Sequence, residues 1–166
     1  MKNFAVLSLA LLLASCAGQN LQQALDKNNT SQTCPETGSC TVEIMRNTTL
    51  TIKDDIEGKF YYKTERNTDF TVIRYKYVKD TNPALADAGY TEEVVFEVDN
   101  NTKTLSYTGK DMQKTNMLLG VMCFCKGKAG FYKVEGGSID YKNEKLIIML
   151  PDIVEGQKLK DISISF

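Results

Sequence analysis

The chain has 166 residues, a formal net charge of −1 and no histidine. This length fits one domain with a sizeable core, and a near-neutral balance without basic blocks offers no electrostatic footprint for nucleic acid. The absence of histidine removes the usual general base of serine and cysteine hydrolases and the commonest metal ligand. Carboxylate and Ser–Lys chemistry do not need histidine, but the chain has none of the motifs GxSxG, HExxH or a phosphate-binding glycine loop. We therefore expect a non-enzymatic protein without a cofactor and without a nucleic-acid partner.

The first residues have the layout of a secretory leader. Lys2 precedes an apolar run from Phe4 to Leu13, which only Ser8 interrupts, and the small residues Ala14 and Ser15 follow. This run is too short for a permanent spanning helix and is typical of a signal peptide. We expect residues 1–15 to be removed.

The four residues "LASC", which end at Cys16, resemble the lipobox of bacterial lipoproteins. The resemblance covers the leader alone, and it implies diacylglycerol transfer to the Cys16 thiol, cleavage before Cys16 and acylation of the new amino group. Several acyl chains would hold the protein on a membrane, since a single chain binds only reversibly. Position 17 is Ala rather than Asp, so resemblance to sorted lipoproteins implies the outer membrane, with the leaflet left open.

Residues 16–33 contain few apolar side chains and no aromatic one. We predict a lipidated flexible tether, which would span roughly 20–25 Å on average. The stretch "NLQQALDK" within it has some helical character but is too short to persist as an isolated helix.

From Cys40 onward, apolar residues recur with a period of two. Turn signals such as "DNNTK", "KGKAG" and "EGG" separate about ten strand-like segments. Residues 34–166 are therefore expected to form one all-β domain, a two-sheet antiparallel β-sandwich of about 8–10 strands, with a small β-barrel as the alternative. The ranges 82–89 and 111–120 are candidates for one short helix each.

Eight tyrosines and two carboxylate pairs are the polar candidates. Alternation places Tyr75 and Tyr77 on one face, where they are expected in the core or at its edge. Tyr61 and Tyr62 must face opposite ways, so that one faces solvent, and both are weak candidates for a binding role, since tyrosine suits protein or carbohydrate contact. The pairs Asp54/Asp55 and Glu92/Glu93 are expected to be solvated charges at strand ends.

Four cysteines remain besides Cys16, namely Cys34, Cys40, Cys123 and Cys125. An even number in an exported protein favours disulfides. A bond between Cys123 and Cys125 looks difficult, because two residues of an extended strand that lie two apart have Cα atoms about 6.5–7 Å apart. We therefore predict that the 34–40 loop lies against the 123–125 strand and forms two cross-bridges. Cys34–Cys123 with Cys40–Cys125 and the reverse pairing remain equally open.

A metal site is the competing interpretation of the same thiols. Four thiolates would suit zinc, and Met112, Met117 and Met122 beside the second pair would suit Cu(I). The spacing lacks the usual C-x₂-C geometry, and free thiolates outside the cytoplasm tend to oxidise, so disulfides without a metal are preferred.

Taken together, these residues predict a lipid-anchored cell-envelope protein. We expect a non-enzymatic binding, scaffold or accessory module that meets an envelope protein or glycan partner. The alternatives are a β-barrel carrier of an apolar ligand and a Cys/Met metal-binding protein of the envelope.

Overall fold

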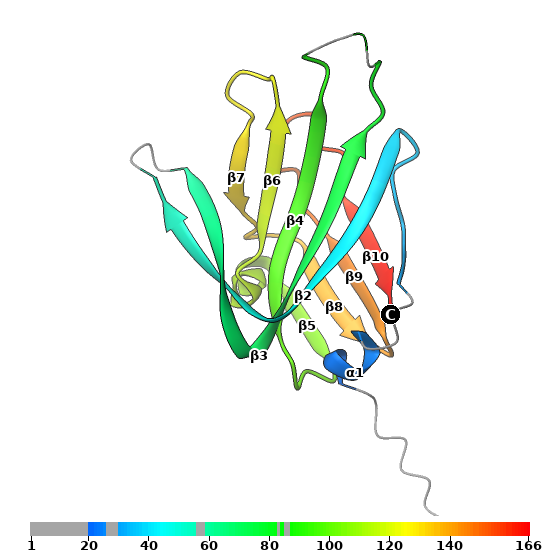
Figure 1. The fold of residues 1–166 in the computed structure, drawn as a ribbon, viewed down its shortest axis with the longest axis vertical. Helices are drawn as coiled ribbons and strands as arrows, with labels where there is room; N and C mark the ends of the chain where they lie inside the picture. Colours follow the sequence, from blue (N-terminus) through cyan, green and yellow to red (C-terminus); the bar gives the residue numbers. More distant parts are fainter. Residues whose placement is uncertain (1–19, 26–29, 56–58, 83, 85–86) are drawn as a thin grey trace, which may run out of the picture.

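A computed structural model describes residues 20–25, 30–55, 59–82, 84 and 87–166 of the chain. Strands dominate these parts, as Figure 1 shows. The elements are α1 (Leu21–Leu25), β1 (Ser31–Gln32), β2 (Gly38–Asp54), β3 (Phe60–Lys79), β4 (Tyr90–Asp99), β5 (Leu105–Thr108), the 3₁₀ helix η1 (Gly109–Thr115), β6 (Leu118–Cys123), β7 (Gly130–Lys133), β8 (Ser138–Lys142), β9 (Lys145–Met149) and β10 (Asp161–Ser165).

The strands form two five-stranded sheets, with orders β1-β10-β9-β8-β5 and β2-β3-β4-β6-β7. Neighbouring strands run antiparallel, and the two sheets lie face to face (Figure 1). The predicted all-β, two-sheet antiparallel sandwich is confirmed.

The side chains on the inward faces of the strands fill the space between the two sheets. Val94, Phe96 and Val98 of β4 face inward, as do Tyr75 and Tyr77 of β3, and these side chains are at most 4% exposed. The second sheet contributes Ile139, Tyr141, Leu146, Ile148, Ile162 and Ile164 to the same cluster. The expectation that Tyr75 and Tyr77 belong to the core is confirmed.

The predicted tether is wrong for its described part. Residues 21–25 form the helix α1, whose Leu21, Ala24 and Leu25 are almost completely buried in the main core. Asn20 and Gln23 cap this helix reciprocally, because each accepts a hydrogen bond on its side-chain oxygen from the backbone N–H of the other. Tertiary packing thus stabilises a helix that would not persist alone. The folded domain therefore includes residues 20–25, which precede the predicted start at Cys34.

A two-residue strand also lies in the range predicted to be tether. In β1, Ser31 pairs with Ser165 and Gln32 pairs with Ile164 at the edge of one sheet. So short a strand leaves almost no periodic pattern in the sequence, which is why alternation missed it.

The strands β2 and β3 bend halfway along their length. The pairing register shifts between Arg46 and Thr48, and Asn47 takes a left-handed backbone conformation with φ of 52°. Beyond this bulge, residues 48–54 and 60–66 form an arm, which projects beside the sheet in Figure 1. The far end of the arm returns to the sheet, since Phe60 of β3 pairs with Phe131 of β7.

A second, smaller core lies where the arm meets the outer face of its own sheet. Leu50 from the arm packs with Val72, Val95 and Leu118, and all four are at most 5% exposed. Met45, Ile52, Tyr62 and Phe131 surround them. Apolar residues on both faces of β3 and β4 are therefore buried, although an antiparallel sheet ordinarily needs only one apolar face.

One of the two candidate short helices is present, as a 3₁₀ helix. It begins at Gly109, two residues before the predicted range 111–120, and stops at Thr115, where Asn116 with φ of 51° ends it. Residues from Leu118 onward belong to the buried strand β6. In the range 82–89, the described residues form turns and irregular chain, and Pro83, Leu85 and Ala86 lie outside the described part.

Candidate functional site

The two ends of the sandwich differ in character. At one end, α1 closes the core, and the backbone N–H of Leu21 donates to Thr102 O in the β4–β5 connection. At the other end, the connections 34–38, 124–129 and 150–160 come together at the opposite ends of the strands (Figure 1). We call this the loop end. Both disulfides lie there.

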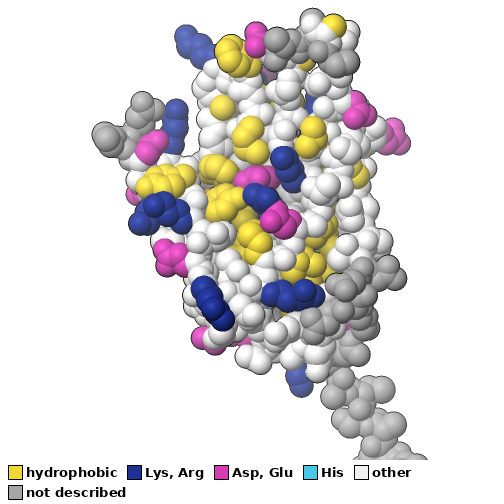
Figure 2. Space-filling view, viewed as in Figure 1, with side chains coloured by type: hydrophobic (Ala, Val, Ile, Leu, Met, Phe, Trp, Pro, Cys, Tyr) yellow, Lys and Arg dark blue, Asp and Glu magenta, His cyan; other side chains and the backbone are white. Residues whose placement is uncertain are grey.

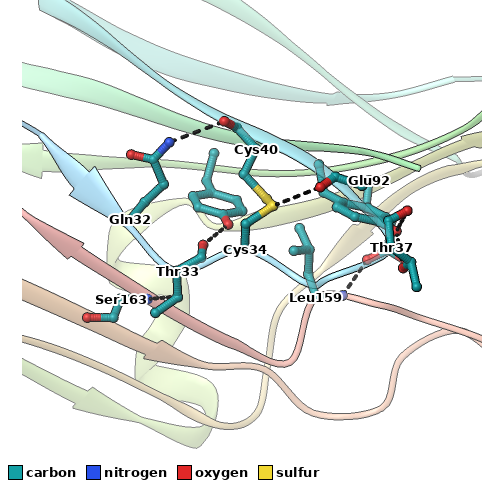
Figure 3. The surroundings of a disulfide bond; sticks show 11 residues. Gln32, Thr33, Cys34, Thr37, Cys40, Glu92, Leu159 and Ser163 are labelled. Atoms are coloured by element: carbon teal, nitrogen blue, oxygen red, sulfur yellow. Dashed lines mark hydrogen bonds between the residues drawn. A yellow bond between two sulfur atoms is a disulfide. The ribbon is translucent and has the colours of Figure 1, made fainter. Parts of the chain in front are cut away.

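The first disulfide joins Cys34 and Cys40, with Cα atoms 5.6 Å apart. Figure 3 shows how the loop between them is held: Gln32 Nε2 donates to Cys40 O at 3.2 Å, and Ser163 N donates to Thr33 Oγ1 at 2.9 Å. On its other side, Thr37 shares a 2.8 Å hydrogen bond with the hydroxyl of Tyr77, and Asp80 N donates to Thr37 O. The loop is therefore fixed to both sheets independently of its sulfur bond.

The second disulfide joins Cys123 and Cys125, with Cα atoms 5.2 Å apart. Strand β6 ends at Cys123, which pairs with Tyr90, and Cys125 lies already in the turn that leads to β7. Between them, Phe124 is 85% exposed, the highest value among the large exposed hydrophobic residues of the described chain. The disulfide thus closes a three-residue turn that presents an aromatic ring to solvent.

The predicted cross-bridges between the two cysteine pairs are wrong. Cys40 lies on β2 and Cys123 at the end of β6, and β3 and β4 lie between these strands in the sheet. At about 4.8 Å per strand, this separates the two pairs by roughly 14 Å, far beyond bridging distance. The difficulty foreseen for a Cys123–Cys125 bond assumed an extended chain. The chain leaves the strand after Cys123, and this bend brings the Cα atoms close enough.

The same separation removes the four-thiolate zinc site. In the described part of the chain, no group of three or more cysteine, aspartate and glutamate residues could hold a metal. Met112 and Met117 are completely buried in the main core, and Met122 lies on the outer face of β6 with 37% of its surface exposed. The methionines proposed for Cu(I) therefore do not gather beside the thiols.

A buried carboxylate holds the 150–160 connection at the loop end. Glu92 on β4 is fully buried, and it accepts hydrogen bonds from the backbone N–H groups of Lys158 at 2.6 Å and Leu159 at 2.7 Å. The hydroxyl of Tyr90 also donates to Glu92, and burial, reinforced by this carboxylate, raises the pKa of Tyr90. Glu92 thus joins its own sheet to the connection that leads into β10 of the other sheet.

An exposed ion pair lies nearby. Lys128 Nζ is 2.8 Å from Glu155 Oε2, and the hydrogen bond from Lys128 lowers the pKa of the Glu155 carboxyl. The pair joins the turn after the second disulfide to the 150–160 connection, so these two loops of the loop end are in direct contact.

Two more buried carboxylates hold the arm. Glu97 accepts hydrogen bonds from Thr49 Oγ1, Leu50 N and Asn116 Nδ2, each at 2.6 Å. Glu93 accepts a hydrogen bond from Tyr62 at 3.1 Å. Glu92 and Glu93 face opposite sides of β4, and both are buried, so the expectation that they are solvated is wrong. Asp54 and Asp55 are exposed.

The two tyrosines singled out from the sequence lie on the arm and not at the loop end. Tyr61 is 39% exposed, whereas Tyr62 is half-buried and packs edge-on against Phe131 with ring centroids 5.3 Å apart. Burial is the largest cause that raises the pKa of Tyr62, with Arg74 acting in the opposite direction. The prediction that one of the pair faces solvent is confirmed, but the structure does not bring them together with the disulfides. Cys16 lies outside the described residues.

Phe124 received no role from the sequence, although a signal was present. Side chains alternate along an extended chain, so the residue between two cysteines on one face points away from both. A large apolar residue at that position is therefore expected to face solvent once the cysteines face the core, and Cys123 does pack against the main core.

No protein-family model, no curated protein and no solved structure matches the chain. Within the ranges that the structure describes, no helix is long and apolar enough to cross a membrane.

Proposed function

We propose that the protein is a lipid-anchored, non-enzymatic binding module of the cell envelope, which contacts a partner protein through its loop end. The observation that carries this proposal is Phe124, an 85% exposed aromatic ring in a turn closed by a disulfide. Exposed aromatic residues that are already held in place make strong anchors in interfaces, because little conformational entropy is lost on binding.

The surroundings of Phe124 suit a protein partner. Val78 and Met122, 40% and 37% exposed, lie on the outer face of the same sheet, where each is paired with Thr91 in the strand between them. On this face, charged side chains of both signs are scattered among the exposed hydrophobic ones (Figure 2). An apolar contact with a mixed polar rim is typical of protein interfaces. A glycan partner has less support, because only Tyr61 of the two sequence-based candidates is exposed, whereas Tyr62 packs half-buried against Phe131.

The position of α1 fits this role if Cys16 carries the lipid. Three residues separate Cys16 from Asn20, so these two Cα atoms are at most about 14 Å apart. The end with α1 would then face the membrane closely. Strand β4, with 10 residues, places the loop end about 30 Å farther away. Phe124 would thus be presented outward, toward other envelope components.

We prefer this function to the carrier alternative because the space between the two sheets is filled by the side chains of the main core. The depression beside the bend of the arm is open and lined largely by polar residues, such as Arg46, Thr64 and Arg66. The metal-binding alternative has no support from the position of the cysteines.

The test compares Phe124→Ser with Ile147→Ser in the full-length protein. Ile147 is 40% exposed on the outer face of the other sheet and therefore controls for the loss of a surface hydrophobic residue. Each protein is expressed in bacteria that export it to the cell envelope. It is crosslinked in intact cells, and its adducts are identified by quantitative mass spectrometry. We expect Phe124→Ser to lose adducts that wild type and Ile147→Ser share. Identical adduct sets for all three proteins would contradict the proposal.

The anchor is tested separately. Metabolic labelling with an alkyne fatty acid should mark the wild-type protein and not a Cys16→Ser variant, and fractionation should move the variant out of the outer-membrane fraction. Labelling of the variant, or an absence of label on the wild type, would contradict the lipid anchor without bearing on the loop end.

A further inference from the structure

The two disulfides differ in what keeps their cysteines together. Around Cys34 and Cys40, hydrogen bonds from Gln32, Tyr77 and Asp80 hold the loop from both sides. Gly38 inside this loop lies so close to the carbonyl oxygen of Val78 that a Cβ atom would be only 2.3 Å from it. If the bond were reduced, this packing would keep the two thiols close together, and the bond would readily form again.

Cys123 and Cys125 have less support. The turn that follows them is held at Lys128, which pairs with Glu155 and accepts a hydrogen bond from the hydroxyl of Tyr132. Cys123 is fixed by its pairing with Tyr90, whereas Cys125 lies beyond the strand, and its carbonyl oxygen accepts a hydrogen bond from Lys128 N within the same turn at 3.2 Å. The Cα atoms are 5.2 Å apart, whereas an extended chain holds such atoms about 6.5–7 Å apart. Reduction therefore lets the chain extend past the end of β6 and separates the thiols.

The second disulfide is also open to an incoming polypeptide. Its two cysteines are half-buried rather than covered, Phe124 between them is 85% exposed, and Lys126 beside them is exposed. An exposed ring gives an unfolded or extended segment an apolar contact, and the positive charge attracts a thiolate. Disulfides that are poorly supported and accessible are generally the exchangeable ones.

We infer that Cys123–Cys125 is a thiol–disulfide exchange site, whose substrate is a polypeptide with two cysteine thiols. The exchange is stoichiometric rather than catalytic, so it goes beyond the proposed binding function without making the protein an enzyme. It needs neither the lipid anchor nor the partner of the loop end. Cys123 packs against the main core, and Cys125 is not part of that cluster. The incoming thiolate therefore attacks Cys125 Sγ.

The exchange proceeds in two balanced steps. In the first, the substrate thiolate forms a bond to Cys125 Sγ, the Cys123–Cys125 bond breaks, and its electron pair leaves on Cys123 as a thiolate, which takes up the proton lost by the substrate thiol. In the second, the other substrate thiolate attacks the substrate sulfur of the mixed disulfide and releases Cys125 as a thiolate, which takes up the proton lost by that second thiol. The substrate is oxidised by two electrons to a disulfide, and the pair Cys123 and Cys125 is reduced to two thiols.

The test uses the Cys34–Cys40 bond of the same molecule as its control. The purified full-length protein is equilibrated in a series of reduced and oxidised glutathione mixtures, alkylated rapidly, digested and analysed by mass spectrometry. We expect Cys123 and Cys125 to become alkylated in mixtures whose reducing ratio is about tenfold or more below that needed for Cys34 and Cys40. The glutathione adduct should be found on Cys125 in excess over Cys123.

A second measurement follows the substrate. A synthetic peptide with two thiols should be oxidised by one equivalent of wild-type protein, and not by Cys123→Ser/Cys125→Ser, whose folding is checked by its thermal unfolding transition. Phe124→Ser retains the disulfide, so exchange with glutathione should persist in it. Equal or greater resistance of Cys123–Cys125 to reduction, or free thiols at these positions in the isolated protein, would overturn the inference. Neither outcome would change the interpretation of the crosslinking experiment on Phe124.

Discussion

The carboxylate of Glu92, in the middle of one sheet, accepts a 2.7 Å hydrogen bond from the backbone amide of Leu159, which lies 67 residues later on the approach to the other sheet. A second amide, that of Lys158, donates to the same group at 2.6 Å. An acidic residue at a fully buried position is costly unless its oxygens are hydrogen-bonded, and here backbone donors supply those bonds.

We predict that Glu92→Gln destabilises the domain by about 1–3 kcal/mol. The amide keeps one acceptor oxygen but turns an NH₂ group toward a backbone donor, which leaves a buried N–H without a partner. Urea unfolding followed by circular dichroism measures the loss. Glu135→Gln, at an exposed position between β7 and β8, should change the free energy of unfolding little. Equal effects would show that the amides of Lys158 and Leu159 do not depend on Glu92.

Glu97→Gln should loosen the arm more than the sandwich. Glu97 accepts hydrogen bonds from Leu50 N and Thr49 Oγ1 of the arm on one oxygen, and from Asn116 Nδ2 at the end of η1 on the other. A glutamine side chain has only one oxygen and cannot accept all of these bonds. We expect faster hydrogen exchange in residues 48–54, measured by mass spectrometry, with little change in β9 and β10. Glu65→Gln on the exposed face of the arm is the control, and unchanged protection of residues 48–54 would contradict this role of Glu97.

Leu21→Ala tests whether the N-terminal segment is part of the core. Leu21 is completely buried, so its truncation should lower the free energy of unfolding by about 2–5 kcal/mol. Gln22→Ala changes the neighbouring half-buried residue and should have a much smaller effect in the same denaturant titration. If both variants unfolded like the wild type, the segment would behave as the tether predicted from the sequence.

Two buried tyrosines should respond in opposite ways to the loss of their hydroxyl group. The hydroxyl of Tyr75 donates to Thr33 O, whereas the hydroxyl of Tyr141 is buried without a hydrogen-bond partner in the described part of the chain. Tyr75→Phe should cost about 1 kcal/mol, and Tyr141→Phe should be neutral or stabilising, because it removes an unpaired polar group. Thermal unfolding of both variants measures this, and an equal loss for the two would contradict the assignment.

Stability should also fall in alkaline solution. Burial raises the pKa of Tyr75 from 10.0 to about 12, so the folded state holds its phenolic proton where the unfolded chain releases it. The contribution is fully present below pH 10 and is lost as the pH rises through about 12. Denaturant titrations across this interval should give a weaker pH dependence for Tyr75→Phe than for wild type. The same slope in both would show that Tyr75 does not contribute.

Much of the sandwich could be predicted because alternation is a strong signal where one face of a strand is buried. Val94, Phe96 and Val98 show this, and so do Tyr75 and Tyr77. Alternation is silent about long-range contacts, however. Glu92 resembles a surface charge in the sequence, because its partners are backbone amides more than sixty residues away.

The errors at the candidate site have the same origin. Strand order decides which cysteines can meet, and the sequence does not show that β3 and β4 separate β2 from β6. The short segment at Leu21 has too little periodicity to reveal that it packs into the core. Alternation alone predicts that Phe124 points away from its two flanking cysteines and toward solvent.

The bend at Asn47 has a consequence for how the protein behaves in solution. It folds the arm back so that Leu50 covers Val72, Val95 and Leu118, three apolar side chains on the outer face of a sheet that would otherwise meet water. A chain whose hairpin ended at the bend would expose these apolar side chains to water and would be prone to self-association. The arm thus preserves the solubility of the sheet from which it extends.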